Sequence, residues 1–144
     1  MTGPAGSGVP ILRLGDVLLT GLLDELGDKA ATVFTEELTD RVLADRARGV
    51  IIDISRLEFV DSFVARVLLE LGTAARLLGT RVIVAGMRPA VAITLVELGL
   101  GLPGVETALN AEQGMAALGW QQGPRDRTPR DRAAGQEAAH APHR

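Results

Sequence analysis

Residues 49–65 read GVIIDISRLEFVDSFVA, and this stretch decides the fold. Its first part, residues 49–54, is a nearly continuous β-branched apolar run, which is typical of a strand buried on both faces of a sheet. Further on, apolar side chains recur at the spacing of one helix face: Val64, Val67, Leu68, Leu71, Ala75 and Leu78. The stretch therefore predicts a buried strand, a loop and an amphipathic helix in immediate succession.

The helix is expected to begin at Asp61-Ser62. Both side chains would then lie at the positive end of the helix dipole, beside backbone N–H groups that lack intrahelical partners. The simplest interpretation is an N-cap, which Asp and Ser both form well. The other interpretation is a modification site, because a helix N-terminus tolerates a phosphoserine, which would add about two negative charges beside Asp61. These residues alone leave both interpretations open.

Upstream of this stretch the sequence predicts a hairpin and a helix. Two short apolar runs flank a Gly15-Asp16 turn, and we predict strands over residues 11–14 and 17–22. A helix begins at Asp28, and its apolar residues share one face: Ala30, Val33, Phe34, Leu38 and Val42. Gly49 is expected to end this helix, because glycine commonly follows a helix C-terminus.

Downstream the sequence predicts two further strands and two further helices. The strands cover residues 81–85 and 105–109, the second of them at a sheet edge. One helix begins at Pro89, a favourable first-turn position, and carries the apolar residues Val91, Leu95, Val96 and Leu98. The other helix covers residues 111–118, with Asn110 as its cap.

Apolar strands that alternate with amphipathic helices indicate an α/β fold, with a mixed, mostly parallel sheet flanked by helices. The 144 residues suffice for one such domain, and 47% hydrophobic residues supply its core. We assign the domain to residues 10–120. Residues 1–9 are rich in Gly and Pro, and residues 121–144 lack apolar periodicity, so we expect both ends to be disordered.

The net charge is unevenly distributed. Residues 121–144 contain five arginines and three acidic residues, so residues 1–120 carry a charge of −5 and the whole chain −3. An acidic domain is a poor match for nucleic acid, whose phosphates need a basic surface. No apolar run approaches the roughly 18 to 20 residues of a membrane span, the first residues do not resemble a signal peptide, and cysteine is absent. The sequence therefore predicts a cytoplasmic protein that binds neither nucleic acid nor membrane.

The predicted domain lacks the residues from which common catalytic and cofactor sites are built. Both histidines, His140 and His143, lie in residues 121–144, and the chain has no Cys or Tyr. A Ser–His–Asp or Cys–His site and an ordinary zinc site are therefore excluded from residues 10–120. The segment GLGLPG at residues 99–104 matches the dinucleotide fingerprint, but it follows a predicted helix where that fingerprint must follow a strand. We predict no catalytic residue, no metal and no cofactor.

Three carboxylates still require an interpretation. Asp53 ends the buried strand, as a phosphoacceptor aspartate does in a response-regulator receiver domain. The acidic pair and late lysine of such a site are missing, because Asp16 stands alone and Lys29 is the only lysine. We expect Asp53 to accept hydrogen bonds from loop amides. Glu58 and Asp61 could form an acid–base pair, but nothing beside them suggests a substrate pocket, and a solvated loop is expected.

Taken together, the segments resemble STAS domains of the anti-sigma-factor-antagonist family, and in particular the RsbS-type antagonists of the stressosome. The resemblance covers about residues 10–118 as one collinear set, and the segments that carry it are 49–54, 59–65, 76–79, 82–86, 88–99 and 105–109. It implies a mixed sheet flanked by helices, without enzymatic activity. It also implies an oligomer, either of this chain or with RsbR-type co-antagonists.

The resemblance also implies a switch. In this family an RsbT-type serine kinase phosphorylates the serine of the Asp-Ser-Phe motif, which corresponds to Ser62 here. The unmodified antagonist holds the kinase in a large assembly, and phosphorylation releases the kinase to start a stress response. The implied partner-binding residues are Glu58, Asp61, Ser62 and Phe63. Thr94 matches a second phosphosite of the co-antagonists, but we expect its hydroxyl to bond its own helix backbone.

Three alternatives remain at this stage. The protein could be a simple anti-anti-sigma factor that binds an anti-sigma-factor kinase directly, although residues 88–99 resemble that group less. It could be an enzyme of an unrecognised type, against which the missing His, Cys and suitably placed Lys argue. It could also be a structural STAS module in which Ser62 is only a helix cap. Partner binding by a Ser62→Asp variant discriminates the switch from the structural module.

Overall fold

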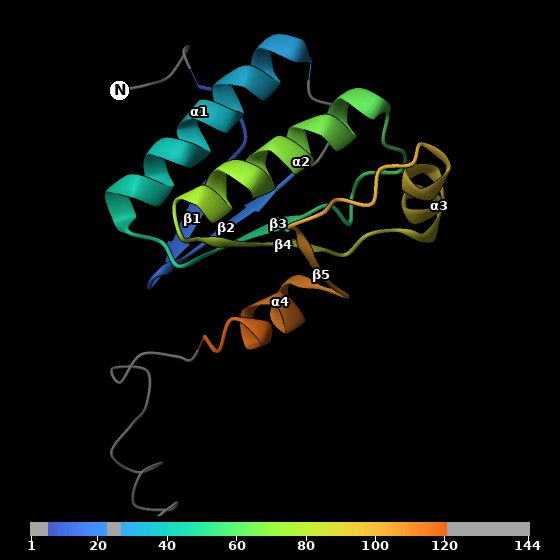
Figure 1. The fold of residues 1–144 in the computed structure, drawn as a ribbon. Helices are drawn as coiled ribbons and strands as arrows, with labels where there is room; N and C mark the ends of the chain where they lie inside the picture. Colours follow the sequence, from blue (N-terminus) through green and yellow to red (C-terminus); the bar gives the residue numbers. More distant parts are fainter. Residues whose placement is uncertain (1–5, 23–26, 121–144) are drawn as a thin grey trace, which may run out of the picture.

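A five-stranded sheet with the strand order β1-β2-β3-β4-β5 forms the centre of the molecule in the computed structural model, which describes residues 6–22 and 27–120 (Figure 1). β1 and β2 form an antiparallel hairpin, and the pairs from β2 to β5 are parallel. The strands are β1 (Ile11–Leu14), β2 (Val17–Gly21), β3 (Gly49–Asp53), β4 (Arg81–Ala85) and β5 (Glu106–Ala108). The predicted α/β class and mixed, mostly parallel sheet are confirmed.

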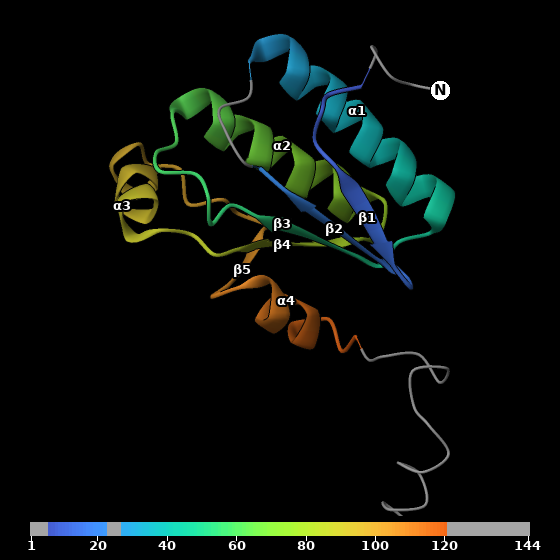
Figure 2. The same cartoon turned by 180° about the vertical axis from the view of Figure 1, so that it is seen from behind.

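Helices cover both faces of this sheet. α1 (Asp28–Asp45) and α2 (Ser62–Leu77) lie side by side on one face, and α4 (Ala111–Ala117) lies on the other (Figures 1 and 2). Side chains of β3 alternate between the two layers: Val50 and Ile52 join the core under α1 and α2, and Ile51 joins the smaller core under α4. This alternation explains why the run at residues 49–54 is apolar throughout.

The first helix ends earlier than predicted. α1 stops at Asp45, and the left-handed residue after it is Arg46, with φ of 51°. Gly49 instead begins β3, where a Cβ atom would lie 2.5 Å from Cδ1 of Leu118. The prediction that Gly49 ends the helix is therefore wrong, because this glycine makes room for the end of α4 on the sheet.

The third helix is placed at the end of the sheet. α3 (Pro89–Glu97) begins at Pro89 as predicted, and it lies beyond the carboxyl ends of the strands instead of flat on either face (Figures 1 and 2). Only Val91 and Leu95 are buried, whereas the side chains of Val96 and Leu98 are 79% and 44% exposed. The predicted apolar face is thus wrong for Val96 and Leu98, since a helix at the rim buries only a narrow stripe.

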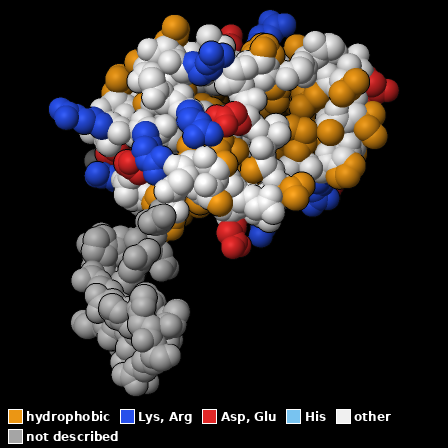
Figure 3. Space-filling view, turned by 60° about the horizontal axis from the view of Figure 1, so that its bottom comes forward, with side chains coloured by type: hydrophobic (Ala, Val, Ile, Leu, Met, Phe, Trp, Pro, Cys, Tyr) orange, Lys and Arg blue, Asp and Glu red, His pale blue; other side chains and the backbone are white. Residues whose placement is uncertain are grey.

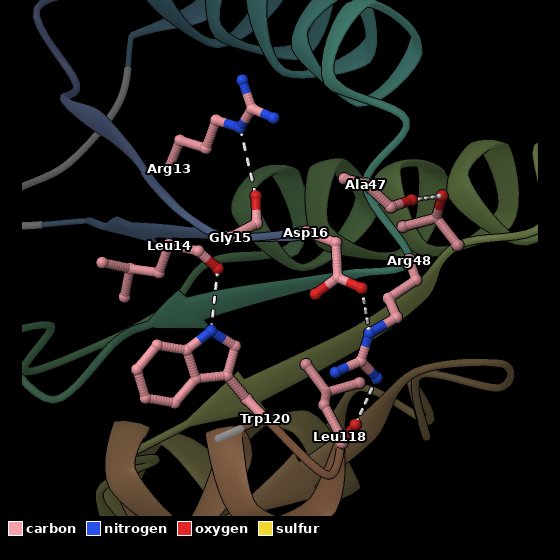
Figure 4. Close-up of polar contacts among 9 residues, drawn as sticks. Arg13, Leu14, Gly15, Asp16, Ala47, Arg48, Leu118 and Trp120 are labelled. Carbon is pink, nitrogen blue, oxygen red and sulfur yellow. Dashed lines mark hydrogen bonds and ion pairs between the residues drawn. The ribbon is translucent and has the colours of Figure 1, made fainter. Parts of the chain in front are cut away.

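The carboxyl end of α4 is fixed to the start of the sheet (Figure 4). Arg48 forms an ion pair with Asp16 at 2.5 Å and donates a hydrogen bond to the carbonyl of Leu118. Trp120 Nε1 donates to the carbonyl of Leu14 at 2.9 Å, across 106 residues of sequence. These contacts hold α4 over the smaller core, to which Val17 and Ile51 of the sheet belong. Cations near carbonyls at a helix C-terminus also complement the helix dipole.

The two ends assigned to disorder are only partly described. Residues 1–5 and 121–144 lie outside the described part of the chain, so the assignment of both ends remains a prediction there. Residues 6–9 are described: the amide of Ser7 donates to Oε1 of Glu37 at 3.0 Å, and Val9 packs against the main core. None of the helices in the described ranges is long and apolar enough to cross a membrane.

Candidate phosphorylation and docking site

Two buried side chains, those of Leu57 and Val60, anchor the loop between β3 and α2. Leu57 is 4% exposed and Val60 is 3% exposed, and the amide of Leu57 donates to the carbonyl of Ile54 at 3.0 Å. Between these anchors Glu58 is exposed, and the Phe59 side chain is 59% exposed. The loop is thus held firmly while it presents one acidic and one aromatic side chain to solvent.

Asp61 is the N-cap of α2. Its Oδ1 accepts a hydrogen bond from the amide of Val64 at 2.8 Å, and its carbonyl accepts one from the amide of Ala65 at 3.1 Å. The cap interpretation is therefore confirmed for Asp61 and wrong for Ser62. Ser62 is the first residue of the helix and is exposed, and no described residue accepts or donates a hydrogen bond at its hydroxyl.

The predicted partner-binding residues lie together at the start of α2, but they differ in exposure. Glu58, Asp61 and Ser62 are exposed, whereas Phe63 is half-buried and packs against the main core. Phe63 therefore contributes to the anchoring of this turn as well as to its surface. Phe59 is an exposed apolar residue that the sequence did not mark as part of the site. Only the burial of Leu57 and Val60 in the folded loop leaves the Phe59 side chain on the outer side.

The loop after β4 supports the loop after β3. Asp53 Oδ1 accepts a hydrogen bond from the amide of Ser55 at 2.8 Å, which confirms the role expected of this strand-end carboxylate. Arg88 Nε donates to the carbonyl of Ser55 at 2.8 Å. Gly86, with φ of +75°, lies so near that a Cβ there would be 2.8 Å from Cβ of Ser55. Arg88 was not foreseen, because its partner lies 33 residues away in sequence.

Thr94 has the local contact that we expected. Its Oγ1 donates to the carbonyl of Ala90 at 2.9 Å, one turn earlier in α3, and the residue is half-buried. This hydroxyl differs from that of Ser62, which has no such contact within the described residues. The assignment of Thr94 as a secondary phosphosite stays a prediction.

Exposed apolar side chains accompany this end of the molecule. α3 lies at the same end of the sheet as the start of α2 (Figure 1), and the space-filling view shows hydrophobic side chains gathered at that end (Figure 3). Four large apolar side chains are exposed here: Phe59 in the loop before α2, Ile93 and Val96 on α3, and Leu98 directly after α3. Surfaces of this kind are typical of protein–protein contact. Among the described residues, no cluster of His, Cys, Asp or Glu could hold a metal ion.

Comparisons with known proteins place this geometry in a family. Residues 16–107 match the STAS domain. The chain is 44% identical to a solved variant of RsbS from Moorella thermoacetica in which a serine is replaced by glutamate; the TM-score is 0.70, over 78% of this chain and 95% of that one. It is 45% identical to a chain in the solved architecture of the stressosome, a signal integration and transduction hub, with a TM-score of 0.68 over 76% of this chain and 96% of that one.

A curated relative points the same way. RsbT co-antagonist protein RsbRA of Bacillus subtilis (strain 168) is 31% identical over 107 residues, which are 74% of this chain and 38% of the relative. The chain thus spans well under half the length of that relative. It belongs to the STAS domain family. Within this family it resembles the RsbS-type antagonists of the stressosome, as the sequence predicted.

Proposed function

We propose that this protein is an RsbS-type antagonist that sequesters an RsbT-type serine/threonine kinase in a stressosome-like assembly and releases it when Ser62 is phosphorylated. The observation that carries the proposal is the state of Ser62, an exposed hydroxyl on the first residue of a capped helix, beside the exposed Phe59. The protein would act in the cytoplasm, by binding instead of catalysis, in the regulation of a general stress response.

The proposed release has a physical cause in the charge of the site. Asp61 and Glu58 already place two carboxylates near Ser62, and residues 1–120 carry a net charge of −5. Phosphorylation adds about 1.5 to 2 further negative charges at neutral pH. A kinase docked against this turn would then face like-charge repulsion and the loss of contact at Ser62, so its affinity falls.

The proposed assembly follows from the relatives and from the surface. Proteins similar to this chain carry the names RsbS and RsbT co-antagonist, and a further similar chain was solved in the stressosome. Three large apolar side chains of the α3 segment, Ile93, Val96 and Leu98, are exposed in the isolated chain. We propose that RsbR-type STAS proteins, or further copies of this chain, are the partners in that assembly.

The test is a native pull-down with mass spectrometry, using wild type, Ser62→Ala, Ser62→Asp and Thr73→Asp as baits. Thr73 lies exposed on the same helix three turns away, so its variant adds the same charge at a different place. Wild type, Ser62→Ala and Thr73→Asp should retain a small kinase and STAS proteins, and Ser62→Asp should lose the kinase.

The outcomes separate the alternatives. Retention of the kinase by Ser62→Asp would show that Ser62 is no switch and would leave a structural STAS module. A kinase recovered without any other STAS protein would favour the simple anti-anti-sigma factor. In cells, Ser62→Ala should bind the kinase permanently and block the stress response.

A further inference from the structure

We infer that Asp61 is a positioning residue for the phosphorylation of Ser62: as a hydrogen-bond acceptor it fixes Ser62 as the first residue of α2 and keeps the hydroxyl turned to solvent. The inference rests on the proposed function, because it concerns how the same serine is presented. It differs from a role of Asp61 in contact with the kinase, because it requires only the acceptor oxygen of residue 61 and not its charge.

The contacts around Asp61 support this assignment. One oxygen of the carboxylate is already engaged by the amide of Val64, and the backbone carbonyl by the amide of Ala65. Val60 before the cap and Ala65 in the first turn are both buried, the arrangement of a hydrophobic staple. Ser62 is thus held between fixed neighbours, and Asp61 is the only side chain among the described residues that caps this turn.

The charge of Asp61 does not help the transfer itself. A kinase must bring the terminal phosphate of ATP, which is strongly anionic, to the hydroxyl of Ser62. A carboxylate on the adjacent residue repels that phosphate, which favours a contribution of Asp61 through geometry. Without the cap, the first turn of α2 frays and Ser62 joins the loop, and the kinase then has to order it at the cost of rate.

The first test needs no kinase and uses the absence of cysteine from the chain. Ser62→Cys provides a single thiol, which is combined with either Asp61→Asn or Asp61→Ala; both remove the charge, but only Asn caps well. The rate of alkylation by iodoacetamide is measured against pH. Because a helix N-terminus lowers the pKa of a thiol, the midpoint should lie lower in the Asn variant than in the Ala variant. Equal midpoints would overturn the inference.

The second test measures phosphorylation by a purified RsbT-type kinase with ATP. Asp61→Ala should lower kcat/KM by about tenfold or more, and Asp61→Asn should restore most of it. Asn110→Ala is the matched control, because Asn110 caps α4 by the same contact, to the amide of Gln113 at 2.8 Å, far from Ser62. It should lower the melting temperature as Asp61→Ala does, with the rate unchanged.

The outcomes are distinct. If Asp61→Asn is as slow as Asp61→Ala, the carboxylate acts through its charge or as a base, and the inference fails. If Asn110→Ala slows phosphorylation equally, the effect is a general loss of stability, and the inference also fails. If wild type itself is not phosphorylated, the proposed function fails, and the alkylation midpoints still decide whether the cap holds residue 62 in place.

Discussion

Gly49 has no side chain, and Leu118 fills the space that one would need. A Cβ at Gly49 would lie 2.5 Å from Cδ1 and 2.7 Å from Cδ2 of Leu118, which is buried under α4. We therefore expect Gly49→Ala to destabilise the protein by about 1–3 kcal/mol, since the buried Leu118 side chain, α4 or the strand must shift. The measurement is the free energy of unfolding in denaturant.

Gly101→Ala is the control for that prediction. Nothing lies within 4 Å of a Cβ built at Gly101, and its φ is outside the left-handed region. We expect its effect on the free energy of unfolding to be close to zero. Equal losses in the two variants would mean that the contact with Leu118 is not what requires a glycine at residue 49.

At the residue scale, the sequence predicted roles that depend on near neighbours and missed those that depend on distant ones. The sequence limits the N-cap of α2 to Asp61 or Ser62. Only the backbone geometry at the start of the helix shows that the cap is Asp61. Asn110 was identified as a cap because its partner lies three residues away. The role of Gly49 was misjudged, because Leu118 approaches it from 69 positions further along the chain.

At the scale of elements, a double hydrogen bond between side chains joins β4 to β5 in addition to their parallel backbone pairing. Arg81 donates to both carboxylate oxygens of Glu106, at 2.8 and 2.6 Å, and these bonds hold the pKa of Glu106 below its ordinary value. Because the pKa is lower in the folded protein than in the unfolded chain, the pair stabilises the fold above about pH 4.3, and this contribution is lost as the pH falls through the folded value.

Glu106→Gln tests this pH dependence. At pH 7 the variant should melt lower than wild type, by no more than about 4 °C because the pair is half exposed. At pH 3 the difference between the two melting temperatures should shrink, because Glu106 of the wild type is then increasingly protonated. A difference that stays constant from pH 7 to pH 3 would show that the ion pair is not its source.

The elements themselves were predicted well where their pattern is local. The strands over 11–14 and 81–85 have the predicted bounds, because short apolar runs and the flanking turns define them. α3 was predicted in place, but its exposed residues were not, because the sequence does not reveal that this helix lies beyond the end of the sheet. Phe59 was missed for a similar reason, since loop exposure depends on which neighbours are anchored.

At the scale of the whole molecule, the two ends of the sheet carry different groups of residues. The carboxyl ends of the parallel strands carry the loops with Asp53 and Arg88 and the start of α2, where Ser62 is exposed. The amino ends carry Arg48 and the contact of Trp120 with the hairpin (Figure 4). A kinase that binds beside Ser62, as we propose, would therefore lie away from the contacts that hold α4 over the smaller core.

This division predicts where the chain can be shortened. Residues 121–144 lack apolar periodicity, so their deletion should leave the melting temperature unchanged. Trp120→Phe, by contrast, removes the hydrogen bond to the carbonyl of Leu14 and should cost about 0.5–1.5 kcal/mol. Thermal unfolding of the two variants checks both statements. A large loss on deletion would move the domain boundary beyond residue 120.

The position of Trp120 has one more consequence, for spectroscopy. It is the only tryptophan of the chain, and its half-buried indole joins the hairpin turn to the segment after α4. Its fluorescence emission therefore reports on one contact, between the hairpin turn and the segment after α4, at the opposite end of the sheet from Ser62. Emission that stays constant while a partner binds would report that this contact is intact, and a red shift would report that Trp120 has become exposed to water.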